Sequence, residues 1–164
     1  MSCEYYSYWY RLNNEDSFLI WFSNEKDGVV VDENGFVPSF GKKSDLKNYC
    51  EKNQIKVDLD NSNLTNLDTI KNWLDKGGKL EDYNLYLDTW NLFEDIAIST
   101  NGNFDKDKAV TNDIYDRIFW GCNLPAVTPE GESFTPTWTK KELKIIHKTL
   151  TFGLQMFREK IKYQ

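Results

Sequence analysis

The stretch from residue 83 to residue 100, YNLYLDTWNLFEDIAIST, constrains the fold more than any other part of this chain. It has the apolar spacing of one helix, and a helix that is apolar around nearly all of its circumference belongs inside a domain. It is too polar and too short to span a membrane. We therefore predict a central helix over residues 83–99 on which the rest of the chain packs. Its apolar residues form two sides: Leu85, Leu92 and Ile96 on one, and Tyr86, Trp90, Phe93 and Ala97 on the other.

One narrow polar stripe interrupts this apolar surface. Asn84, Asp88, Asn91 and Asp95 follow one another at offsets of four, three and four, so they stack on one helical face. A buried carboxylate needs a partner. The stripe therefore either pairs with cations and backbone groups elsewhere in the fold or lines a functional site, and the sequence leaves both interpretations open.

The stripe holds the best candidates for chemistry. Asp88 and Asp95 are two helical turns apart, roughly 10 Å along the axis, which is too far for a retaining carboxylate pair and slightly beyond an inverting pair. With Asn91 between them they could help to hold a hard cation, but the repeated spacing of a helical metal site is absent. A small carboxylate- or metal-dependent hydrolase is the alternative function. A polar stripe satisfied by Arg117, lysines and loop amides is favoured, because structural ion networks outnumber sites.

Length, composition and charge favour one domain over residues 1–164. The chain has 164 residues, of which 40% are hydrophobic and 15% aromatic, so it can bury a core without disulfides or metals. Its formal net charge is −6, which argues against direct nucleic-acid binding, because that needs a basic surface. An acidic balance suits a basic protein partner, and it is also common among soluble cytosolic proteins.

The cysteines and the single histidine exclude several site classes. Cys3, Cys50 and Cys122 are odd in number and far apart, which favours a reducing cytoplasm over a disulfide framework or a zinc site. Any Ser–His or Cys–His catalysis would have to use His147, which has no motif around it. We expect a cytoplasmic protein with no signal peptide, membrane span, metal or cofactor.

Residues 1–60 are predicted to form a sheet-rich part. Aromatic and apolar runs separated by polar turns indicate an antiparallel meander, and Ser44 is expected to cap a short helix. Residues 54–59 alternate in polarity and indicate an edge strand, followed by a polar connector over residues 58–63. The predicted elements are strands at 5–12, 17–23 and 29–31 and a helix at 45–52.

Residues 61–164 are predicted to form a helical part. Thr65, followed by Asp68, is expected to cap one helix, and Gly77-Gly78 to end it. Thr139 and Glu142 have the spacing of a capping box that starts the last helix. Besides the central helix, helices are predicted at 107–120 and from 140 to near 162. The predicted class is α+β, with a small N-terminal antiparallel sheet packed against a C-terminal helical bundle.

Two segments are candidates for contact with a partner. The loop over residues 120–138 is long, and its three prolines constrain it, so it is either a binding loop or a rigid crossover. Asn123, Thr128, Glu130 and Glu132 are its candidate contacts. In the first strand, Tyr6, Tyr8 and Tyr10 share one face and Tyr5 and Trp9 the other. One face is predicted to be core, and the other is either a contact surface or covered by helices.

Three segments together carry a resemblance: FGKKSDLKNYCEKNQI (40–55), WNLFEDIAIST (90–100) and IFWGCNLPAVTPEGESFTPTW (118–138). They resemble small acidic bacterial proteins that serve as immunity proteins in polymorphic toxin and contact-dependent growth inhibition systems. The similarity covers roughly residues 35–160 and is a pattern of core and loop residues, so it transfers no functional residue. It implies a non-enzymatic protein that binds one cognate toxin, such as a basic nuclease, and neutralises it by direct contact.

The expected interface draws on acidic turns and on the loop. An acidic, aromatic-rich inhibitor suits a basic partner, because opposite charges steer association and buried aromatic side chains anchor it. The predicted contacts are Glu15, Asp16, Glu25, Asp27, Asp32 and Glu33 in the turns of the meander, and Asn123, Glu130 and Glu132 in the loop.

Overall fold

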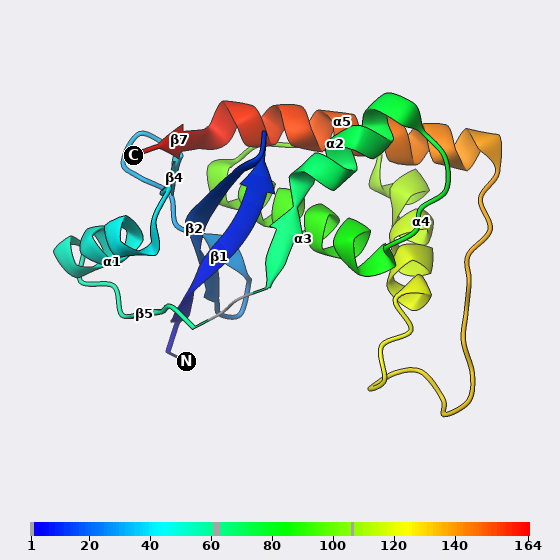
Figure 1. The fold of residues 1–164 in the computed structure, drawn as a ribbon, viewed down its shortest axis with the longest axis horizontal. Coiled ribbons are helices and arrows are strands. Elements are labelled where there is room, and N and C mark those ends of the chain that lie inside the picture. The colour runs from blue at the N-terminus through cyan, green and yellow to red at the C-terminus, as the bar shows by residue number, and fades with distance from the viewer. Residues whose placement is uncertain (1, 61–62, 106) are drawn as a thin grey trace.

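The computed structural model describes residues 2–60, 63–105 and 107–164 (Figure 1). The predicted connector therefore lies partly outside the described residues, because positions 61–62 fall within it. In chain order the elements are β1 (Glu4–Leu12), β2 (Glu15–Ser23), β3 (Gly28–Val29), β4 (Val37–Ser39), α1 (Lys43–Lys52), β5 (Val57–Asp58), β6 (Leu64–Asn66), α2 (Leu67–Lys76), α3 (Tyr83–Thr100), α4 (Lys108–Gly121), α5 (Lys140–Lys160) and β7 (Ile161–Tyr163).

The main sheet has the strand order β3-β2-β1-β5, and β6 also pairs with β1. β1 and β2 pair antiparallel along their whole length, and β3 continues the meander. Asn13 and Asn14 join β1 to β2 with φ angles of 55° and 59°, the left-handed conformation that a two-residue hairpin turn needs. β5 and β6 run parallel to β1. The α+β class is confirmed, and the sheet is mixed, because its last two strands return to the edge of β1 in the parallel sense.

Aromatic side chains pair directly across β1 and β2. The ring centroids of Tyr5 and Phe22 are 6.0 Å apart, those of Tyr6 and Trp21 5.7 Å, and those of Trp9 and Phe18 6.5 Å. Each pair occupies directly opposed positions in the strand register. Such pairs stabilise neighbouring strands, which explains why this aromatic stretch forms a long hairpin.

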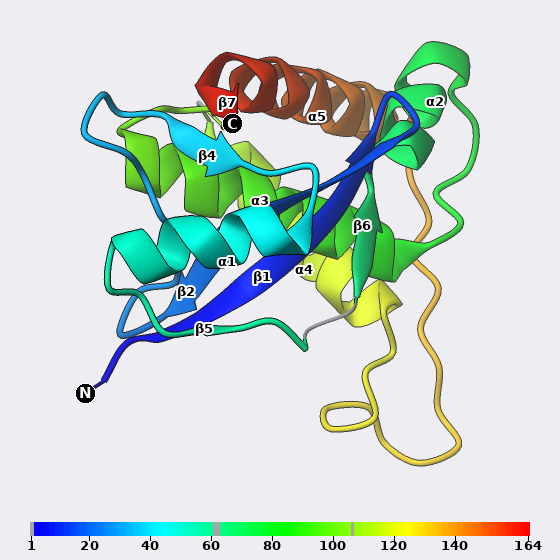
Figure 2. The ribbon, with the colours of Figure 1, turned by 60° about the vertical axis from the view of Figure 1, so that its left-hand side comes forward.

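Helices cover both faces of the sheet (Figure 2). On one face, Ile20 packs with Phe40 and with Leu46 and Cys50 of α1. On the other, Tyr10 is fully buried and meets Phe157 of α5 edge to face at 5.1 Å between ring centroids. Of the two arrangements that the sequence left open for the aromatic strand, the structure has the one in which helices lie on both sides.

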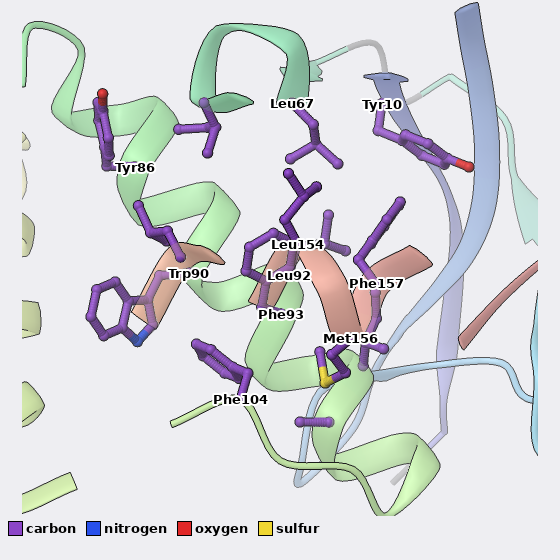
Figure 3. Close-up of a cluster of buried hydrophobic side chains, with 14 of the residues drawn as sticks. Tyr10, Leu67, Tyr86, Trp90, Leu92, Phe93, Phe104, Leu154, Met156 and Phe157 are labelled. Carbon is purple, nitrogen blue, oxygen red and sulfur yellow. The ribbon is translucent and has the colours of Figure 1, made fainter. Parts of the chain in front are cut away.

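The helix α3 spans the predicted stretch and occupies the centre of the fold. Asp82 caps its start by accepting a hydrogen bond from the Leu85 N–H at 3.2 Å. Asn101 ends it in the left-handed conformation, with φ 56°. In Figure 3 its side chains point toward those of neighbouring elements. The buried residues of the helix are Tyr86, Leu87, Thr89, Trp90, Leu92, Phe93, Ile96 and Ala97.

Two predicted helix caps are wrong. The residue before α1 is Lys42, which makes no side-chain cap bond, and Ser44 lies inside the helix. The cap of α2 is Asn66, whose side chain accepts from the Asp68 N–H at 3.1 Å. Thr65 instead belongs to β6, and its hydroxyl is 2.7 Å from that of Tyr8. The helix α2 therefore begins at Leu67, later than predicted, because the residues before it pair with β1 as strand β6.

The end of the last helix also differs from the prediction. The capping box of Thr139 and Glu142 is present and α5 begins at Lys140 as predicted, but the helix ends at Lys160. Residues Ile161–Tyr163 form β7, which pairs in parallel with the unpredicted strand β4, Val37–Ser39. A three-residue strand that contains Pro38 has no recognisable pattern of its own. None of the helices in the described ranges has the length and apolarity needed to cross a membrane.

A glycine in α5 permits the close approach of α3. A Cβ atom at Gly153 would clash with the ring of Phe93, whose side chain is fully buried. We predict that Gly153→Ala lowers the free energy of unfolding by about 1–3 kcal/mol, as overpacking does, although alanine favours helices more than glycine.

Urea unfolding at pH 7 measures this effect, with Gly41→Ala as the control. A Cβ atom at Gly41 would meet no atom within 4 Å, so this variant should stay within about 0.5 kcal/mol of the parent. Equal stability of the two variants would contradict the predicted packing of α3 on α5.

Candidate functional site

The polar stripe of α3 lies along the boundary of the buried core. Asn84 and Asp88 are exposed, whereas Asn91 and Asp95 are half-buried. The partners of the half-buried pair are aromatic: Trp21 Nε1 of β2 donates to Asp95 Oδ2 at 2.9 Å, and the Tyr115 hydroxyl of α4 donates to Asn91 Oδ1 at 2.7 Å. The stripe therefore joins α3 to the sheet on one side and to α4 on the other.

The predicted partners of the stripe are wrong in part. Arg117 does not pair with it, since its guanidinium contacts Asp113 and Glu142. One lysine contacts one acidic residue of α3: Lys108 Nζ is 2.5 Å from Oε1 of Glu94, which lies beside the stripe. In the part of the chain that the structure describes, no three His, Cys, Asp or Glu side chains converge as they would around a metal ion.

Burial shifts the ionisation of both stripe carboxylates. The pKa of Asp95 is raised to about 6: burial is the main cause, the hydrogen bond from Trp21 opposes it, and the nearby charges of Asp27 and Glu94 add to it. Partial burial of the Asp88 carboxylate, and then the charge of Asp82, raise the pKa of Asp88, although the residue as a whole is exposed. A carboxyl group that titrates near neutral pH is suited to proton transfer. Because its folded-state pKa is raised, its ionisation also lowers the free energy of unfolding.

The loop between α4 and α5 is closed at its base by one side chain. The Asn123 amide donates to the Phe134 carbonyl at 2.9 Å and accepts from the Phe134 N–H at 2.7 Å. Asn123 has a φ of 49°, which an asparagine tolerates better than most residues. Pro136 is buried, and the loop projects away from the rest of the fold in Figures 1 and 2. Two hydrogen bonds thus clamp residue 123 to residue 134 across the loop.

Arg117 joins this base to the helices on either side. Its guanidinium pairs with Glu142 at the start of α5 and lies 4.5 Å from the centroid of the Trp138 ring. Its Nη1 donates to the Thr137 carbonyl at 3.3 Å. Trp138 in turn donates through Nε1 to the Tyr83 hydroxyl at 2.9 Å, so the end of the loop is also tied to the first turn of α3.

Three large apolar side chains of this region are exposed around one hollow. The exposed fractions are 47% for Trp120, 46% for Val127 and 44% for Phe134. The hollow has a volume of about 330 Å³, and Asn123 and Glu132 also line it. We call these three side chains with the hollow between them the loop surface. Clustered exposed aromatic residues on a rigid backbone are typical of protein–protein contacts.

The structure brings together the predicted loop contacts but not the predicted turn contacts. Asn123 and Glu132 line the loop surface, and Glu130 is exposed on the same loop. Most of the hydrogen-bonding capacity of the Asn123 side chain is used inside the loop, so its role is to position the loop backbone. Sequence reasoning missed Trp120, Val127 and Phe134. Val127 and Phe134 lie among the loop prolines, where no helix or strand pattern required apolar residues, whereas Trp120 lies in the last turn of α4 and had no such signal.

The acidic turn residues are spread over the sheet. Glu15 and Asp16 lie at the start of β2, whereas Asp27 follows its end; a nine-residue strand separates the two turns by roughly 30 Å. Asp16 is paired with Arg11, with Oδ1 2.6 Å from Nε. Asp32 holds its own turn by accepting from the Asn34 and Phe36 N–H groups at 2.8 and 3.0 Å. These side chains therefore form no common surface; Glu25 and Glu33 are also exposed in these turns.

Comparison with known proteins supports the fold alone. No protein-family model matches this chain, and neither does any curated protein sequence. The crystal structure of the SatS C-terminal domain in complex with bromine superposes with a TM-score of 0.57, covering 98% of this chain and 94% of that one, at 8% sequence identity. At such low identity the likeness supports the α+β arrangement and identifies neither a family nor an activity.

The raised pKa of Asp95 predicts a specific pH dependence of stability. The folded-state pKa of about 6 lies above the ordinary value of 3.8, so the protonated form favours folding. This contribution is fully present below about pH 4 and is lost as the pH rises through 6. Asp95→Asn keeps an acceptor for Trp21 without the charge, so we predict that it raises the free energy of unfolding at pH 7.5 by about 1–2 kcal/mol, after allowance for solvent screening.

Urea unfolding at pH 4 and pH 7.5 measures this difference. At pH 4 the variant and the parent should be equally stable, and Asp75→Asn, a change at an exposed position of α2, should show no comparable gain at pH 7.5. A destabilised Asp95→Asn variant at pH 7.5 would contradict the assigned cause.

Proposed function

We propose that this chain is a non-enzymatic immunity protein that binds one cognate bacterial toxin in the cytoplasm and neutralises it by direct contact. The observation that carries the proposal is the loop surface. Its three apolar side chains, Trp120, Val127 and Phe134, are each at least 44% exposed, whereas most other large apolar side chains of the chain are buried in the core. Solvent-exposed aromatic groups of this kind become stable when a partner covers them.

Hydrogen bonds within the loop constrain its backbone before a partner binds, which lowers the entropic cost of binding. The Asn123 clamp and the Arg117 contacts hold the loop between α4 and α5. Val127 and Thr128 add backbone bonds to the Leu124 carbonyl at 3.1 and 3.0 Å. A contact surface that is ordered before binding loses less conformational entropy on association, and aromatic anchors in such a surface contribute most of the binding energy.

The charge around the loop surface favours a basic partner. Residues 109–139 contain four acidic side chains and one basic side chain, Arg117. Arg117 is neutralised by Asp113 and Glu142, which leaves two exposed acidic side chains: Glu132, which lines the hollow, and Glu130 of the same loop. Negative charge at the rim of an apolar contact steers a positively charged protein and disfavours acidic ones. A basic nuclease toxin is a partner of this kind.

The hydrolase alternative has one observation in its favour, the raised pKa of Asp95, which suits a general acid near neutral pH. Two observations count against it. One oxygen of Asp95 is engaged by the Trp21 indole, and Asp88 lies two turns away on the exposed side of α3. The immunity proposal therefore accounts for more of the structure.

The proposal predicts that one toxin binds and that the loop surface carries the binding energy. The partner is sought as the product of a toxin gene beside this one, and binding is measured by calorimetry with the purified pair. We expect Trp120→Ala and Phe134→Ala each to weaken binding roughly 30-fold or more, as loss of a hot-spot residue does. Neutralisation of the toxin in growing cells should fall in parallel.

Two sets of control variants separate the alternatives. Ile98→Ala removes an apolar side chain that is 53% exposed on α3, and it should leave binding unchanged. Asp88→Asn and Asp95→Asn should also bind and protect normally. Loss of a hydrolytic activity in these two variants, with no toxin bound by the parent, would replace the immunity function with the hydrolase function.

A further inference from the structure

We infer that a second surface, formed by Tyr6, Trp21, Asp58 and Asp60, binds the guanidinium group of an arginine side chain in a partner polypeptide. This site lies on the main sheet and shares no residue with the loop surface, so it stands independently of the immunity function. It lines an open hollow of about 520 Å³, to which Ser23 also contributes.

The strand register places the key side chains in one row. Tyr6 on β1 is directly opposite Trp21 on β2 and, on its other side, directly opposite Asp58 on β5. Side chains at opposed positions of neighbouring strands point to the same face of a sheet, roughly 5 Å apart. The result is a row of two aromatic rings followed by a carboxylate, about 10 Å long from Trp21 to Asp58.

Each of the two rings is held in place by a carboxylate. The Tyr6 hydroxyl donates to Glu4 Oε2 at 2.5 Å, and Trp21 Nε1 donates to Asp95 Oδ2 at 2.9 Å. The ring centroids are 5.7 Å apart with an interplanar angle of 41°. When the hydroxyl of a tyrosine or the N–H of an indole donates to a carboxylate, its proton is drawn toward the anion. The ring becomes more electron-rich, and its attraction for a cation increases.

The negative charge of this site is not neutralised within the described chain. Among the ion pairs of the described residues, none involves Glu4, Asp58 or Asp60. The hydrogen bond to Glu4, with a smaller contribution from the charge of Asp58, raises the pKa of Tyr6. One oxygen of Asp58 accepts from the Asp60 N–H at 2.8 Å, which fixes the carboxylate and leaves its other oxygen available. A cation is the ligand that this field favours.

Arginine fits the site better than other cations. Its guanidinium is planar, stacks on aromatic faces and donates in a fork to carboxylate oxygens, whereas an ammonium group is a compact and strongly hydrated point charge. A metal ion is disfavoured, because no three carboxylates of the described residues converge here. The open shape of the hollow suits a side chain that arrives from another polypeptide.

The test uses the indole N–H resonance of Trp21, identified by its loss in Trp21→Phe. The 15N-labelled protein is titrated at pH 7 with a capped Gly-Arg-Gly peptide, and in parallel with the same peptide carrying citrulline, the uncharged counterpart of arginine, or lysine. We expect a saturable shift of the Trp21 resonance with the arginine peptide, binding at least tenfold weaker with lysine, no saturable shift with citrulline, and no movement of the Trp120 indole.

Two double variants with the same change in net charge complete the test. Asp58→Asn with Asp60→Asn should weaken arginine binding at least tenfold, whereas Glu130→Gln with Glu132→Gln should leave it within twofold. The proposal is overturned if no saturable shift occurs, if citrulline or lysine matches arginine, or if the two double variants weaken binding equally. None of these results depends on finding a toxin, so the failure of this site and the failure of the immunity function are distinguishable.

Discussion

The burial of α3 is the constraint on which the rest of the structure depends. A helix that is apolar around most of its surface must be covered from several directions. The sheet, α5 and α4 supply that cover. The ring of Phe93, for example, contacts both Phe104 and Phe157, with ring centroids about 6 Å apart in each pair. Gly153 lets α5 come close enough to complete the packing. The polar stripe marks the line along α3 where this cover ends.

Aromatic donors connect the core to both candidate surfaces. Trp21 bonds Asp95 of α3 and also forms part of the Tyr6–Trp21 row, while Trp138 bonds Tyr83 and stacks with Arg117 at the base of the loop. Each indole has one apolar body to bury and one N–H to satisfy. The same residues that complete the core therefore also fix the geometry of the surface groups next to them.

Local patterns identified the helices well and the site poorly. The bounds of α3 follow from its own apolar spacing, and the start of α5 follows from the capping box of Thr139 and Glu142. The stripe was recognised for the same reason, since helical spacing alone puts Asp88, Asn91 and Asp95 on one face. Its partners, Trp21 and Tyr115, come from distant segments, and no local pattern distinguishes an indole or phenol donor from the predicted cations.

The sequence by itself determined the α+β class, the central helix and the antiparallel hairpin, because each depends on periodicity or turn chemistry within a short window. Only the tertiary structure decided the parallel pairing of β4 with β7 and of β5 and β6 with β1, because pairing between distant short strands depends on where the intervening elements pack. It also decided which side chains remain exposed. Trp120, Val127 and Phe134 are apolar side chains that lie outside the core, Trp120 at the end of α4 and the other two in the loop that Asn123 bridges to Phe134.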